Sequence, residues 1–247
     1  MEISTTTAVP AEPLPLTSLR WTTGQVVALV VWAAGLNVGQ ALAMQAFHVS
    51  RLPGELPHFI RAVVVFAFYA AILAPVVLSA RRQRVSFSDA VGLKGVAWRP
   101  IAALAFASVV AARLIALLWA YVVVTLRLQL PGGTIDISQV FGRSIAGIIV
   151  TVVVAVFVGP FVEEVVFRGV AFAQLERTQG LLGGIVGSSA LFGLLHINPL
   201  EFLPLVAAGA MFAWLFHATR TLWSAVLAHA LFNLVAVIAV YAVRGVL

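Results

Sequence analysis

The stretch from Ile145 to Val170 reads IAGIIVTVVVAVFVGPFVEEVVFRGV, and its only charged side chains are Glu163, Glu164 and Arg168. It is longer than the roughly 20 apolar residues that a helix needs to cross a bilayer. A charge near the centre of a membrane helix costs on the order of 2.5–3.5 kcal/mol by insertion scales. Because two adjacent acids also repel each other, the fold must supply partners for them. We therefore expect a functional site at this point of the chain.

The rest of the chain has the composition of an integral membrane protein. Of its 247 residues, 62% are hydrophobic and 10% are charged, and the mean hydropathy is +1.07. Soluble domains carry about 25% charged residues. The net charge of +6 indicates basic cytoplasmic loops under the positive-inside rule, rather than a surface that binds nucleic acid. The absence of Cys excludes disulfides, thiolate metal sites and a cysteine nucleophile.

The hydropathy pattern predicts an all-α fold, a polytopic transmembrane helical bundle with about seven to eight membrane helices. We expect one integral membrane domain, with a flexible N-terminal tail over 1–20, N-terminal transmembrane helices over 21–144, and a region over 145–247 that carries the candidate site. The basic link 81–100 is expected on the cytoplasmic side. Seven apolar segments are drawn, at 26–47, 62–80, 101–126, 145–170, 181–195, 203–216 and 224–243.

Small residues follow the fourth segment at helical spacing. Gly180, Gly183, Gly184 and Gly187 form overlapping small-xxx-small pairs, which let two membrane helices approach closely. The fourth and fifth segments are therefore expected side by side, joined by a turn near Thr178.

Three polar constellations occur within the last four segments. In the first, Glu164 and Arg168 are four residues apart and can pair on one helix face. Glu163 lies about 100° round the helix, so it faces other partners. The sequence therefore predicts that Glu164 pairs with Arg168, and that Glu163 has no partner of opposite charge on its own helix.

The other two constellations supply imidazole and amide groups. His196 ends the fifth segment in Phe192-Gly-Leu-Leu-His196, and His229 and Asn233 share one face of the seventh. Counted at about 1.5 Å per residue from the expected cytoplasmic turns, these groups and Glu163 reach overlapping depths. We therefore expect them to line one cavity.

A carboxylate and an imidazole on either side of a water molecule can make that water a nucleophile. An imidazole and an amide can donate hydrogen bonds to the oxygen that becomes negative in a tetrahedral intermediate. Together these groups suffice to hydrolyse a peptide bond without a covalent intermediate. The alternative use is a zinc site, with Glu163, His196 and His229 as the ligands. The His-Glu-x-x-His signature is absent and the ligands would come from three separate helices, which weakens the zinc interpretation without removing it.

In order, the motifs Glu163-Glu164-x-x-x-Arg168, Phe192-x-x-x-His196 and His229-x-x-x-Asn233 resemble those of the CAAX-prenyl-protease and bacteriocin-processing (CPBP, or Abi) family of intramembrane proteases. The resemblance covers about Ile145 to Val243.

The resemblance implies an intramembrane endopeptidase whose catalytic region is 145–247. Glu163 and His196 would activate water, and His229 and Asn233 would stabilise the oxyanion. Glu164 and Arg168 would organise the site or hold the substrate. Both a metal-free and a metallopeptidase mechanism, with one divalent ion such as zinc, are compatible with the family.

The expected partners are the lipid bilayer and a membrane-tethered peptide or protein. Eukaryotic relatives remove the last three residues of prenylated proteins. The Arg-rich, Lys-poor composition favours a bacterial source and a multi-pass protein of the plasma membrane. A bacterial substrate is expected to be a bacteriocin-type peptide or a C-terminal sorting anchor.

Two further function classes use the same residues differently. A proton-coupled transporter would relay protons through the intramembrane Glu and His groups, and a non-catalytic immunity or scaffold protein would keep them for packing. Outside the motifs, Arg113 is expected to pair with a carboxylate or to extend toward the membrane surface. Glu201 is expected on the surface.

Overall fold

The computed structural model describes residues 16–52, 54–95, 97–132 and 137–243, and all regular structure within them is helical. The long helices are α1 (Thr23–Ala46), α2 (Leu56–Arg82), α4 (Trp98–Thr125), α8 (Ala173–Leu195), α9 (Phe202–Thr219) and α10 (Leu222–Val243). The shorter ones are η1 (Val49–Arg51), α3 (Phe87–Val91), α5 (Ile137–Phe141), α6 (Ile145–Thr151) and α7 (Gly159–Glu164). Two π-helical segments, η2 (Val152–Val158) and η3 (Val165–Phe172), flank α7.

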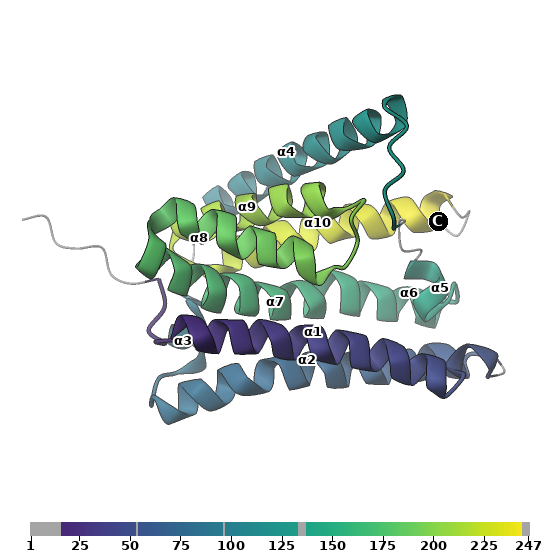
Figure 1. Cartoon of the computed structure of the whole chain (residues 1–247), viewed down its shortest axis with the longest axis horizontal. Helices are drawn as coiled ribbons and strands as arrows, with labels where there is room; N and C mark the ends of the chain where they lie inside the picture. The colour runs from purple at the N-terminus through teal and green to yellow at the C-terminus, as the bar shows by residue number, and fades with distance from the viewer. Residues whose placement is uncertain (1–15, 53, 96, 133–136, 244–247) are drawn as a thin grey trace, which may run out of the picture.

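These helices form a bundle in which α1 and α2 pack together on one side and α4 packs on α9 and α10 on the other (Figure 1). The continuous run from α6 to α8 passes between them. In the described part of the chain, six helical runs are long and apolar enough to cross a membrane. The predicted multi-pass, all-α membrane protein is thereby confirmed.

One of the six runs, Ile145–Leu195, contains two of the predicted segments. Gly180 interrupts it with φ 76° and ψ 177°, a conformation that a residue without a Cβ adopts easily. The chain reverses there, so the helical stretches before and after Gly180 run side by side (Figure 1). At Gly184 a Cβ would lie 3.0 Å from the backbone N of Glu176. The expected close approach of the fourth and fifth segments is therefore confirmed.

The expected flexible tail, 1–20, needs a correction where the structure describes it. Residues 1–15 lie outside the described part of the chain. Leu16 and Leu19 are buried in the core, and the Ser18 N–H donates a hydrogen bond to the Asp89 carbonyl. The end of the tail therefore packs against the bundle, because its leucines find apolar partners there.

Candidate active site

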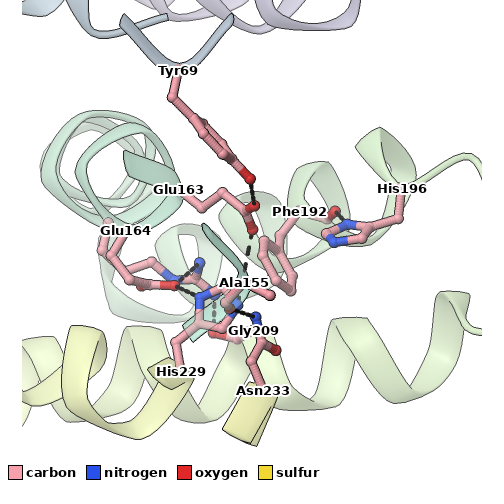
Figure 2. Close-up of polar contacts among 10 residues, drawn as sticks. Tyr69, Ala155, Glu163, Glu164, Phe192, His196, Gly209, His229 and Asn233 are labelled. Atoms are coloured by element: carbon pink, nitrogen blue, oxygen red, sulfur yellow. Dashed lines mark hydrogen bonds and ion pairs between the residues drawn. The ribbon is translucent and has the colours of Figure 1, made fainter. Parts of the chain in front are cut away.

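The two adjacent carboxylates have different surroundings. Glu164 is fully buried in the core, whereas the Glu163 side chain keeps 25% of its surface exposed. In Figure 2 the Glu163 carboxylate points between Tyr69 and His229, while Glu164 turns toward His229. Glu164 also accepts a hydrogen bond from Arg168. The expected division into one paired and one available acid agrees with this arrangement.

Glu164 and Arg168 form the ion pair that their spacing predicts. Arg168 Nη1 lies 3.0 Å from Glu164 Oε1, and neither side chain is exposed. Arg168 Nη2 donates to the Gly209 carbonyl on α9 at 2.9 Å. A Cβ at Gly209 would lie 3.1 Å from that nitrogen. The guanidinium stacks on Phe192 and Phe212, with its carbon 4.8 and 5.3 Å from the ring centres. Ionic, hydrogen-bonding and ring contacts together offset the desolvation of this buried charge.

His229 connects the buried pair to the exposed acid. Its Nδ1 lies 2.7 Å from Glu164 Oε1, the oxygen that also accepts from Arg168. The bond therefore uses an Nδ1–H donor, and Nε2 faces Glu163 Oε2 at 3.9 Å. The imidazole stacks on the Phe212 ring with centroids 5.0 Å apart. Glu164 thus fixes which nitrogen of His229 points toward Glu163, as a carboxylate does behind many catalytic or metal-bound imidazoles.

Glu163 lines a cavity of about 280 Å³ between α1, α2 and α7. The Tyr69 hydroxyl donates to its Oε1 at 3.4 Å. Asn37 and Gln40 of α1 and His196 line the same cavity. The carboxylate therefore faces a space with several polar groups, which is the setting that a bound water needs.

His196 stands at the end of α8 and is exposed. Its Nδ1 lies 2.8 Å from the Phe192 carbonyl. Because a carbonyl only accepts, Nδ1 carries the hydrogen and the neutral ring has its lone pair on Nε2. Figure 2 shows His196 beyond Phe192 from Glu163, and no hydrogen bond or ion pair joins these two described residues. They share the cavity without touching.

Asn233 donates to the backbone of a neighbouring helix, at the point where the hydrogen-bond pattern of that helix is π instead of α. Gly159 donates its N–H to the Val154 carbonyl, five residues back, and Pro160 has no N–H. The Ala155 carbonyl would accept from residue 159 or 160, and neither N–H is available to it. Asn233 Nδ2 donates to this carbonyl instead, at 2.8 Å. The sequence reasoning placed this amide at an oxyanion, and the structure directs one of its hydrogens to the backbone (Figure 2).

A second, larger cavity of about 600 Å³ lies between α4 and α10. His196 and Asn233 line it together with Arg113 and Glu201. Glu201 is half-buried, and this burial raises the pKa of its carboxyl. The expectation of a surface position for Glu201 is therefore wrong, because the link after His196 folds back against α4, where Trp119 Nε1 donates to the Leu200 carbonyl at 2.7 Å.

The residues considered as zinc ligands do not converge. Within the described part of the chain, no group of three or more His, Asp or Glu side chains is arranged to hold a metal ion. One nitrogen of His229 is bonded to Glu164, and His196 lies on the far side of Phe192 from Glu163. This donor set does not fit the tetrahedral cluster of a zinc site, so no chemical step is derived through a metal.

Two contributors were missed by the sequence reasoning. Tyr69 comes from a segment that was interpreted only as a membrane span, and nothing in its local sequence sets it apart. The Phe192 carbonyl is a backbone group, so no residue type identifies it. The polar residues Asn37 and Gln40, unusual in an apolar helix, were the available signal that α1 faces the site.

Comparison with known proteins gives two matches, each over part of the chain. Residues 145–235 match the family model described as Type II CAAX prenyl endopeptidase Rce1-like. The resemblance to the CPBP family is confirmed over this region. An 88-residue stretch is 35% identical to "Putative membrane peptidase YdiL" of Bacillus subtilis (strain 168). That match covers 35% of this chain and 36% of the relative, so the chain spans about a third of that protein. No solved structure matches the chain.

Proposed function

We propose that this protein is an intramembrane endopeptidase that hydrolyses a peptide bond in a membrane-tethered peptide or protein. The observation that supports this most directly is the contrast between the two acids. Glu164 is buried and its Oε1 is bonded to both Arg168 and His229, whereas Glu163 reaches a cavity lined by His196 and lies 3.9 Å from His229 Nε2. A carboxylate that lies near one imidazole and shares a polar cavity with another is suited to act as a general base.

The proposed step begins with a water molecule bound to Glu163 in the cavity that His196 also lines. Glu163 takes a proton from this water as the oxygen attacks the peptide carbonyl carbon, giving a tetrahedral intermediate with a negative oxygen. The C–N bond then breaks, and the proton passes from Glu163 to the leaving nitrogen. His196 accepts a hydrogen bond from the water through Nε2, because its Nδ1–H is held by the Phe192 carbonyl.

His229 and Asn233 are proposed to stabilise the negative oxygen. Since Glu164 accepts from Nδ1–H, His229 donates from Nε2 only as an imidazolium, which lies between the Glu164 and Glu163 carboxylates. Asn233 donates one amide hydrogen to the Ala155 carbonyl and has a second one for the negative oxygen. Glu164 and Arg168 position His229.

A cleavage assay in proteoliposomes with membrane-tethered peptides tests the proposal. Glu163→Gln and His196→Ala are expected to lower kcat/KM by about 10²–10⁴-fold, the usual contribution of general acid–base groups. Glu176→Gln is the matched control, because it removes a carboxylate that bonds to His217 and lines neither site cavity. Wild-type rates of cutting in Glu163→Gln would remove the proposed base, and proton flux that depends on Glu163 without cutting would favour a transporter.

The finer assignments need their own tests. We propose a bacteriocin-type peptide or a C-terminal sorting anchor as the bacterial substrate. Metal analysis of the purified protein with chelator-treated cleavage assays decides the mechanistic type. Retained activity without bound metal supports the glutamate mechanism, and stoichiometric zinc with loss of activity on chelation would replace it.

A further inference from the structure

Arg113 is a charged residue inside a membrane helix that the proposed chemistry does not use. It lies 15 residues after the start of α4 and 12 before its end, about 22 and 18 Å from the two ends. It is therefore near the middle of the span, too deep for a lipid phosphate. A guanidinium at this depth is costly unless it serves a purpose.

The Arg113 guanidinium is held in place by contacts with Phe232, but most of its N–H groups have no hydrogen-bond acceptor among the residues that the structure describes. Nη2 donates to the Phe232 carbonyl, and the guanidinium carbon sits 3.8 Å above the centre of the Phe232 ring. Nε is buried without a hydrogen-bond partner. No carboxylate within the described residues forms an ion pair with it, so the expected pairing with an acid is wrong. Most of its five N–H groups are left for another acceptor.

Arg113 opens into the larger of the two cavities, which two of the candidate catalytic groups also line. The cavity of about 600 Å³ is lined by His196 and Asn233 as well as by Arg113. Apart from Glu201, most of its other lining residues are apolar, such as Ala116, Val123, Val237 and Val240. An occupant of matching chemistry is an apolar peptide segment that carries one negative group.

We propose that Arg113 is a substrate-binding residue that takes a carboxylate of the peptide, supplied by its C-terminus or by an acidic side chain. A planar guanidinium matches the two oxygens of a carboxylate. This inference rests on the proposed peptidase function, because it places the bound peptide next to His196. Glu201, on the α9 side of the cavity, is an opposing negative group that limits how tightly the carboxylate binds.

Binding measurements separate this proposal from catalysis. The full-length Glu163→Gln variant in detergent is titrated with fluorescent membrane-type peptides that share one apolar sequence. One peptide ends in a carboxylate and one in a carboxamide, and a second pair of carboxamide peptides differs in an internal Asp or Asn. We expect about tenfold or greater preference for the acid in one of the pairs, and the pair that shows it identifies the source of the carboxylate.

Substitutions then assign the preference to Arg113. Arg113→Gln is expected to abolish it while leaving the carboxamide affinities unchanged, and Arg113→Lys to keep part of it. Glu201→Gln is expected to enlarge it. Arg99→Gln, which removes an exposed Arg from the first turn of the same helix, is expected to keep it unchanged. Unchanged carboxamide binding also shows that the variant is folded.

Equal affinity for acid and neutral members of both pairs overturns the proposal. So does an equal loss of affinity for every peptide in Arg113→Gln, which would indicate a purely structural residue. If the unsubstituted protein cuts no peptide but the Arg113-dependent preference persists, hydrolysis fails and the carboxylate subsite stands. If it cuts peptides but shows no such preference, the peptidase function stands and the carboxylate subsite fails.

Discussion

The same chemical change at two adjacent positions, Glu163→Gln and Glu164→Gln, is expected to have very different effects on thermal stability. Glu164 balances the fully buried Arg168 at 3.0 Å and orients His229 at 2.7 Å. Breaking a buried ion pair by neutralising one partner costs about 3–5 kcal/mol. At about 2–4 °C per kcal/mol for a chain of this size, the Tm of Glu164→Gln falls by about 6–20 °C.

Glu163→Gln should leave the Tm nearly unchanged. Its side chain is one-quarter exposed, and its contacts at 3.4 and 3.9 Å are longer than good hydrogen bonds. Their loss is expected to cost less than about 1 kcal/mol. Cleavage is nevertheless expected to be lost in Glu163→Gln, because the proposed base is gone.

Thermal unfolding in one detergent, with cleavage measured on the same preparations, checks both expectations. A double variant, Glu164→Gln with Arg168→Met, supplies the control, since replacing both charges removes the unpaired buried cation. It is expected to be more stable than Glu164→Gln alone. Equal Tm values for the two single variants would refute the assignment of Glu164 as the structural acid and Glu163 as the available one.

Three further predictions concern the surroundings of the site. Tyr69→Phe removes the hydroxyl that donates to Glu163 and is expected to lower kcat/KM by about two- to fivefold, measured in the cleavage assay with the Tm unchanged. Asn233→Ala leaves the Ala155 carbonyl without its partner and should lower the unfolding free energy by about 1–3 kcal/mol, read from Tm. Because burial raises the pKa of Glu201, its ionisation opposes folding above the unfolded pKa. Glu201→Gln should therefore raise Tm at pH 7 and lose this advantage near pH 4, which thermal scans across pH would show.

Much of the fold follows from local sequence. Each predicted apolar segment is helical, since a bilayer requires every backbone polar group to be satisfied within the segment. The break between the fourth and fifth segments coincides with Gly180, where the positive φ suits a glycine. The expected tail was the exception, because the burial of Leu16 and Leu19 depends on a surface made by distant helices.

The sequence by itself determined which side chains carry charge where charge is expensive, and the i,i+4 spacing determined that Glu164 pairs with Arg168. Only the tertiary structure decided how the remaining groups are used. Glu163 accepts a hydrogen bond from Tyr69, which is 94 residues away in the chain. Asn233 donates to the Ala155 carbonyl, 78 residues away, which has no donor within its own helix because of Pro160. Spacing along one helix fixes which of its own faces a residue occupies, whereas contacts between helices depend on how the whole bundle packs.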